Sequence, residues 1–371
     1  MTLTNFWWLL IWMFTGGLLI AVMSTYRQSM AGIRHDKARS GLPVLSALLI
    51  VLPFIIWGGF RTNYFGDTGA YRRAFQAIPE GFGELGAYME TITKDRGFYF
   101  LGAVWKNLVG SNDVVYFLAF SLLQVGIVAW LYRKYSPDYW LSIFLFIAST
   151  DYLSWVFNGM RQFTAVVIVL LATPLILKRR YIPAILLILL ASTMHQSALL
   201  MIPFLFVAQG KAWSKRTMVF LVAVLASMAF IDRFTDILDR MMQETQYSNV
   251  VSDWTSWNDD GTNPIRVLVY AMPTLLSLVG LRYIRQAEDP LVDLCTNMSI
   301  VSTGLYMLSM MTSGIFMGRL PIYASLYNYI LLPWELRHMF AGKSYGLLRA
   351  AVVVAYCGFF FYQTHVAWGI L

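Results

Sequence analysis

The sequence predicts an all-α, polytopic integral membrane protein. Of its 371 residues, 58% are hydrophobic and only 13% are charged, whereas an ordinary soluble domain carries about 25% charged residues. The apolar residues also form long runs, which excludes a disordered chain and makes a soluble enzyme a poor fit. We expect about 10–12 transmembrane helices within a single membrane domain, residues 1–371, because most runs reach the roughly 17–25 residues that span a bilayer.

Eleven apolar runs are the candidate spans. The first follows a start without Lys or Arg and lacks a small-residue cleavage site, so we interpret it as an uncleaved helix and not as a signal peptide. The runs cover residues 6–23, 43–60, 113–131, 139–157, 162–177, 182–207, 217–231, 265–281, 292–316, 320–336 and 346–366.

The distribution of basic residues predicts the orientation. Six short loops hold 17 of the 28 Lys and Arg residues, and the segment 232–264 has seven acidic residues against two basic ones. Basic loops face the cytoplasm, so both termini and the loop 232–264 are predicted outside. The six basic loops are 24–42, 132–138, 178–181, 210–217, 282–291 and 337–349.

The segment 178–216 is unusual because both of its ends are basic and should be cytoplasmic. One straight span cannot return to its starting side. The sequence Met194-His195-Gln196-Ser197 interrupts the apolar run, and irregular backbone at membrane depth needs protein or water around it. We therefore predict a broken helical hairpin with His195 at its outer tip. The alternative is one long span with a loop assigned to the wrong side.

The outer-face segment 61–112 contains two amphipathic pieces, Tyr71–Ile78 and Phe98–Leu108, which we expect to be interfacial helices. Asp67 and Tyr71 are four residues apart and would share one helical face. The alternative is an ordinary solvated helix. Asp95-Arg96 is interpreted as no more than a surface pair.

Three arginines lie at predicted outer helix starts: Arg161, Arg266 and Arg319. A helix N-terminus favours anions, and the planar guanidinium binds diphosphate oxygens in pairs. Together they suggest a polyanion site more strongly than any one does. The alternative for Arg161 is that its side chain only extends along the helix to reach the aqueous interface and binds no substrate.

His195 is the candidate general base. It marks a helix break on the outer side, and a histidine titrates near neutral pH. A histidine in an apolar helix is more often a packing residue, which is the alternative here. Asp67 and Asp151 are the reserve candidates for the base.

The sequence lacks the motifs of several enzyme classes. There is no Walker A loop, dinucleotide fingerprint, zinc-protease motif or Gly-x-Ser-x-Gly elbow. Outer loops also lack an Asp-x-Asp pair of the kind that holds a metal-bound nucleotide sugar.

An ordered set of short motifs resembles the EpsG family of Wzy-like exopolysaccharide and O-antigen polymerases. The resemblance runs from about residue 60 to 330; Asp95 departs from the expected acid-Pro-Gly-Phe pattern. The motifs are Gly66-Asp67-Thr68-Gly69-Ala70-Tyr71, Asp95-Arg96-Gly97-Phe98-Tyr99, Gly159-Met160-Arg161-Gln162, His195-Gln196-Ser197-Ala198, and Arg319 with Tyr323.

The resemblance implies a glycosyltransferase of the GT-C kind in the bacterial inner membrane, with no metal and no cofactor. It would join oligosaccharide repeat units carried on undecaprenyl diphosphate at the outer face. A chain-length regulator and a flippase of the same pathway would be its partners, and nucleic acid would not.

The resemblance also implies roles for single residues. Arg161, Arg266 and Arg319 would bind the diphosphate, and Gln162 would contribute to substrate binding. Asp67 and Tyr71 would position the acceptor sugar or orient the arginines, and His195 would take the acceptor proton.

Two alternatives remain at this point. A flippase for lipid-linked sugars would also need outer arginines, but such transporters usually show repeated halves, and none is visible here. A polysaccharide-modifying membrane acyltransferase would use a histidine, but it would not need three diphosphate-binding arginines.

Overall fold

The computed structural model describes residues 3–30, 41–63, 66–242, 261–314 and 316–368. Every regular element in these ranges is a helix, which confirms the predicted all-α class. The helices form two compact units. The first unit comprises Met1–Leu199 and Phe340–Leu371, and the second comprises Leu200–Met339. Each unit is described by itself.

The described helices indicate a multi-pass membrane protein. Five are long and apolar enough to cross a membrane, and the number rises to eight if each of three bent pairs is one span. Three shorter apolar helices remain. The predicted number of 10–12 is reached only if these shorter helices also cross, so it stays a prediction. The five long candidates are Phe6–Arg27, Asp113–Tyr135, Met160–Leu177, Pro290–Ser309 and Gly342–Ala367.

Apolar helices form the body of the first unit. Helix α3 packs along α7, and α10 packs against both α7 and α12. Buried polar groups of α8 are satisfied by neighbouring carbonyls, for example by a 2.7 Å hydrogen bond from the Tyr139 hydroxyl to Ala47. The bounds are α1 Leu3–Trp12, α2 Leu18–Met30, α3 Val44–Gly59, α7 Asp113–Tyr135, α8 Tyr139–Ala148, α9 Asp151–Phe157, α10 Met160–Leu170, α11 Thr173–Leu177, α12 Tyr181–Met194 and α21 Gly342–Phe361.

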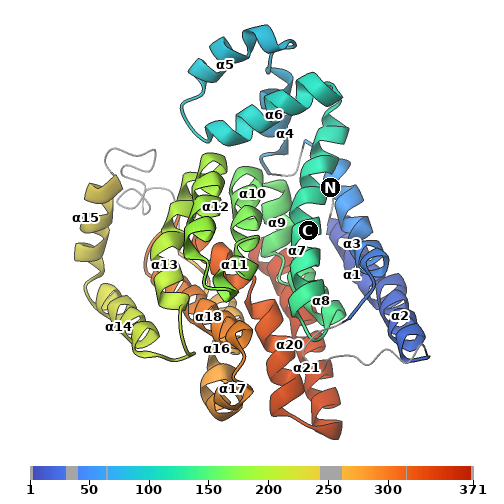
Figure 1. Cartoon of the computed structure of the whole chain (residues 1–371), viewed down its shortest axis with the longest axis vertical. Helices are drawn as coiled ribbons and strands as arrows, with labels where there is room; N and C mark the ends of the chain where they lie inside the picture. Colours follow the sequence, from blue (N-terminus) through green and yellow to red (C-terminus); the bar gives the residue numbers. More distant parts are fainter. Residues whose placement is uncertain (1–2, 31–40, 64–65, 243–260, 315, 369–371) are drawn as a thin grey trace. The chain divides into compact units, whose positions relative to one another are not determined.

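Three short helices connect α3 to α7: α4 (Thr68–Gln76), α5 (Leu85–Thr91) and α6 (Arg96–Val109). Figure 1 shows them gathered at the start of α7. Helices α4 and α6 lie where the sequence predicts amphipathic pieces, which confirms that these pieces are helical. Their position along a membrane surface stays a prediction.

Aromatic contacts fix α4 and α6 against α7. Phe75 of α4 stacks on Tyr116 with ring centroids 4.0 Å apart, and Phe98 of α6 meets Phe120 at 5.1 Å. The buried ammonium of Lys106 donates hydrogen bonds to main-chain carbonyls around the end of α4, the shortest being 2.6 Å to Ile78. A cation at the C-terminus of a helix satisfies its last carbonyls, so Lys106 holds α6 to α4, and the aromatic contacts hold both helices to α7.

The predicted break at His195 is confirmed. Helix α12 ends at Met194, and His195 is extended (φ −159°, ψ 123°). A 3-10 turn, η3 (Gln196–Leu200), and α13 (Met201–Ala208) follow. Two short helices therefore replace one long span. The return of the chain to the cytoplasmic side stays a prediction.

The second unit surrounds α18. This helix packs against α13, α14, α16, α19 and α20. It starts sharply because Pro290 occupies its first turn and the Asp289 side chain accepts the Leu291 N–H. The bounds are α14 Lys215–Ala229, α15 Ile231–Met242, α16 Pro264–Val279, α17 Leu281–Ala287, α18 Pro290–Ser309, α19 Ile322–Ser325 and α20 Asn328–Met339.

Two predicted loops lie partly outside the described residues. Of the acidic segment 232–264, the first part belongs to helix α15, and residues 243–260 are outside the described ranges. Of the basic loop 24–42, residues 31–40, which include His35, are also outside them.

Candidate functional site

Asn158 joins two of the predicted motifs. It precedes α10, and its side-chain oxygen accepts the main-chain N–H of Asp67 at 2.7 Å. Its main-chain carbonyl accepts the Tyr71 hydroxyl at 3.2 Å. Gly66 has a left-handed backbone (φ +51°), and a Cβ atom there would overlap the Asn158 side chain. The start of α4 is therefore held against the start of α10.

Arg161 lies at the start of α10, as predicted, and forms an ion pair that the sequence did not predict. Its Nη1 atom lies 2.7 Å from the carboxylate of Asp95, whose side chain is only 2% exposed. Its guanidinium also lies close enough to the Tyr71 hydroxyl to lower the pKa of that phenol. The interpretation of Asp95-Arg96 as a surface pair is wrong, because Arg96 instead donates to the Met89 carbonyl.

Asp95 connects Arg161 to the helix break at His195. It precedes the first residue of α6 in a left-handed conformation (φ 51°, ψ 41°), and the main-chain N–H of Gln196 lies close enough to its carboxylate to lower the pKa of that carboxyl. Burial raises the pKa of the Asp95 carboxyl, and the charge of Arg161 and the Gln196 N–H offset part of this shift. Burial likewise raises the pKa of the Tyr71 phenol.

His195 and Gln162 meet at Ser197. The Nδ1 atom of His195 lies 2.7 Å from the Ser197 Oγ atom, and the Gln162 amide donates to that Oγ atom at 3.3 Å. Ser197 is buried, and His195 is half-buried. If Nδ1–H donates to Ser197, the other ring nitrogen, Nε2, is the basic one. The arrangement can therefore select the tautomer that a general base needs.

These contacts form one continuous network, which we call the Asp95 network. It brings together the predicted residues Asp67, Tyr71, Arg161, Gln162 and His195. It is completed by Asp95, Asn158, Gln196 and Ser197, which the sequence did not single out as site residues. The signal for three of them was their place in the short motifs that carry the family resemblance, and Asn158 directly precedes the motif with Arg161.

Arg266 and Arg319 belong to the second unit, on neighbouring segments. Arg266 lies in the first turn of α16 with its guanidinium 6.0 Å from the ring centroids of both Tyr270 and Tyr306. Arg319 is exposed and ends the 3-10 turn η5 (Met317–Arg319).

The segments of Arg266 and Arg319 meet at Thr262, which precedes α16. The Thr262 hydroxyl accepts a 2.8 Å hydrogen bond from Ser309, and Gly318 packs so closely that a Cβ atom there would lie 2.7 Å from this hydroxyl. That Arg266 and Arg319 act together with Arg161 stays a prediction.

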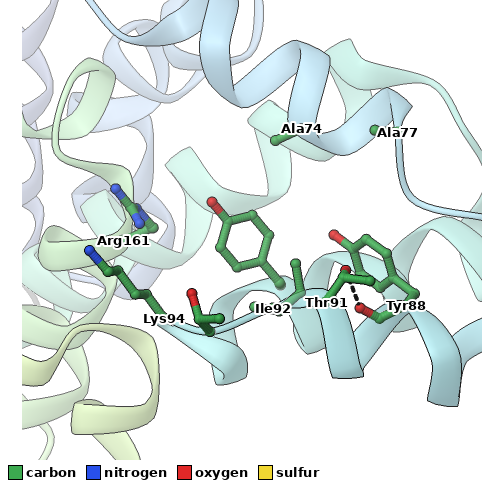
Figure 2. A pocket seen from close by; sticks show the side chains of 9 residues that line it. Ala74, Ala77, Tyr88, Thr91, Ile92, Lys94 and Arg161 are labelled. Atoms are coloured by element: carbon green, nitrogen blue, oxygen red, sulfur yellow. Dashed lines mark hydrogen bonds between the residues drawn. The ribbon is translucent and has the colours of Figure 1, made fainter. Parts of the chain in front are cut away.

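A pocket of about 400 Å³ lies beside the Asp95 network, between α4, α5, α6 and the start of α10. We call it the α4–α6 pocket. Two tyrosines, Tyr88 and Tyr99, and two cationic side chains, Lys94 and Arg161, contribute to its lining. Figure 2 shows Lys94 and Arg161 at one end of it and Tyr88 at the other. Within the described residues, no group of three or more His, Cys, Asp or Glu side chains is arranged to hold a metal ion.

Comparison with known proteins gives one finding. No curated protein and no solved structure shows detectable similarity to this chain. Residues 44–369, most of the chain, match the EpsG family, as the motif resemblance indicated. The chain therefore belongs to the EpsG family of Wzy-like polymerases.

Proposed function

We propose that the protein polymerises oligosaccharide repeat units carried on undecaprenyl diphosphate. The reaction would take place at the outer face of the bacterial inner membrane and yield an O-antigen, capsule or exopolysaccharide. Membership of a polymerase family supports this proposal. The observation that carries it is the Asp95 network, because it holds an arginine and a histidine at one place from motifs far apart in the chain.

The proposed chemistry is a glycosyl transfer without a nucleotide donor. A hydroxyl of the acceptor sugar attacks the anomeric carbon of the donor glycan, and the bond from that carbon to the diphosphate oxygen breaks. Undecaprenyl diphosphate leaves with the bonding electrons, and the acceptor proton moves to Nε2 of His195. A positioned base contributes about 10²–10⁴-fold to such a step.

Arg161 would stabilise the negative charge that develops on the leaving diphosphate. Its pairing with Asp95 fixes the direction of the guanidinium and cancels much of its net charge. In this proposal Arg266 and Arg319 supply the additional positive charge that a diphosphate needs. Asp67 and Tyr71 hold the start of α10, and Asp67 remains the reserve base.

Deleting the gene tests the proposal against its two alternatives. A polymerase mutant accumulates single repeat units on the outer face, whereas a flippase mutant accumulates them inside. An acyltransferase mutant still makes long chains. Long chains in the deletion strain would refute the proposal.

Purified protein with lipid-linked repeat units then tests the base. We expect His195→Ala and His195→Gln to bind substrate but to lose about 10²-fold or more of the polymer formed per folded molecule. A packing histidine would instead lower the yield of folded protein and leave turnover per molecule unchanged. Wild-type turnover in both variants would transfer the role of base to Asp67 or Asp151.

A further inference from the structure

The α4–α6 pocket has a composition that none of the predicted roles explains. Its walls combine two phenol rings, from Tyr88 and Tyr99, with two cations, from Lys94 and Arg161. Two alanines of α4, Ala74 and Ala77, also line it and leave space where larger side chains would fill it. Pockets for small molecules usually measure about 300–1,000 Å³, so this one can hold a sugar ring with its substituents.

The charges in the pocket are unequal. Arg161 is paired with Asp95 at 2.7 Å, and no acidic residue is among the described residues that line the pocket. Lys94, which is exposed, is a second cation in the lining. The pocket therefore has one positive charge more than the Asp95 carboxylate neutralises. An anionic group would be attracted to this end of the pocket, where its charge meets an ammonium and a guanidinium.

The tyrosines suit the ring of a sugar. The face of an aromatic ring is electronegative, so it attracts the C–H bonds of a pyranose while the phenol hydroxyl remains able to hydrogen-bond. Tyr88 and Tyr99 both line the pocket, so both can face one ligand. A lipid chain fits poorly, because it would leave the cations and hydroxyls of the pocket without partners.

We propose that the α4–α6 pocket is a binding subsite for a sugar ring that carries, or is directly linked to, an anionic group. Tyr88 and Tyr99 pack against the ring, and Lys94 with Arg161 binds the anion. The anion is either an acidic substituent within the repeat unit or the diphosphate next to its first sugar. This inference rests on the proposed function, since it assigns part of the lipid-linked glycan to a place beside Arg161.

The test uses the full-length protein and repeat units isolated on their lipid carrier from the deletion strain. Tyr99→Leu removes a ring, Lys94→Gln removes the excess charge, and Ala74→Leu fills the pocket without removing a ligand contact. The matched controls are Phe100→Leu, Arg73→Gln and Ala87→Leu. All three control residues are exposed, and none of them lines the pocket.

Two readouts are measured for every variant: retention of radiolabelled lipid-linked repeat units on immobilised protein, and polymer formation against substrate concentration. Tyr99→Leu and Lys94→Gln should weaken retention and raise KM by about three- to tenfold, because one aromatic or charged contact is lost. Ala74→Leu should have an effect of similar size, because the added side chain occupies space that the ligand would fill. The controls should match the wild type. Retention and KM at control values in all three pocket variants would overturn the subsite.

The two readouts separate this inference from the proposed function. A wild-type protein that retains the repeat unit but makes no polymer would refute the polymerase proposal, while retention lost in the pocket variants would still support the subsite. A wild type that polymerises normally, with pocket variants that do so equally well, would refute the subsite alone.

Competition identifies the source of the anion. Farnesyl diphosphate and the repeat-unit oligosaccharide released from its lipid are each tested as competitors of retention. Competition by farnesyl diphosphate that weakens in Lys94→Gln assigns the anion to the diphosphate. Competition by the released oligosaccharide that weakens in Lys94→Gln assigns the anion to an acidic sugar of the repeat unit. Equal competition in wild type and Lys94→Gln by both compounds would overturn the anionic part of the proposal.

Discussion

At the scale of single residues, Asp95 is the centre of the site. Its carboxylate pairs with the Arg161 guanidinium and lies near the main-chain N–H of Gln196. One buried charge therefore sets the direction of the Arg161 guanidinium and lies beside the segment that carries His195. We interpret Asp95 as a positioning residue, because it acts through Arg161 and His195.

The raised pKa of Asp95 predicts an effect of pH on substrate affinity. The ion pair needs the carboxylate, and burial raises the pKa of this group. The pair is therefore present above that pKa and is lost as the pH falls through it, at a higher pH than for an ordinary aspartate. We expect KM to rise on acidification by about tenfold, since Arg161 is partly exposed and water screens the pair.

The variant Asp95→Asn tests whether the ion pair causes this effect. It should have a high KM at every pH, without the rise on acidification. Steady-state kinetics of both proteins across pH measure KM. An unchanged KM in Asp95→Asn would show that the ion pair does not position Arg161.

At the scale of structural elements, the site depends on where helices break. Helix α12 ends at Met194, α10 begins after Gly159, and α4 begins after Gly66. The sequence could predict these breaks because glycine and polar residues interrupt apolar runs. It could not predict that Asp95 meets Arg161, because the two residues are 66 positions apart. Only the packing of α6 against α12, which itself packs against α10, brings them together.

Gly66 tests whether the junction between α4 and α10 matters for activity. Gly66→Ala places a side chain on a left-handed residue and into the Asn158 side chain. Gly342 is the matched control: its φ is similar (+55° against +51°), and a Cβ atom there meets nothing within 4 Å. Both substitutions should cost about 1–2 kcal/mol of backbone strain.

Only Gly66→Ala should also displace Asn158 and, with it, Arg161. We therefore expect both variants to lose some stability in thermal unfolding, whereas polymer formed per folded molecule should fall at least several-fold in Gly66→Ala alone. Equal specific activity in the two variants would show that the junction supports the fold and not the reaction.

At the scale of the whole molecule, composition and the apolar runs were enough to predict the all-α membrane class. They did not predict that some apolar runs are bent helices. The run 139–157 is divided into α8 and α9 with a 73° bend, and the run 265–281 ends in a 72° bend into α17. A bend depends on the local backbone, as at Thr150 with its positive φ of 67°, and hydrophobicity alone does not report it. The sequence placed the two arginines of the second unit at helix starts, but it could not show that their segments meet at Thr262.

The orientation of the chain gives the last prediction. The basic turns at 178–181 and 210–217 should both be cytoplasmic, and the acidic segment 232–264 should be outside. Alkaline phosphatase, which is active only outside the cytoplasm, should therefore be active when fused within 240–260 and inactive within 210–216. A fluorescent protein that folds only in the cytoplasm should give the opposite pattern at the same sites. Helix α12 ends at His195, and α13 begins after the turn that follows. With both flanking turns in the cytoplasm, this result would place His195 at an outer turn, where the proposed reaction needs a base. An active phosphatase at 210–216 would instead mean that the segment crosses the membrane once, and His195 would lie at membrane depth.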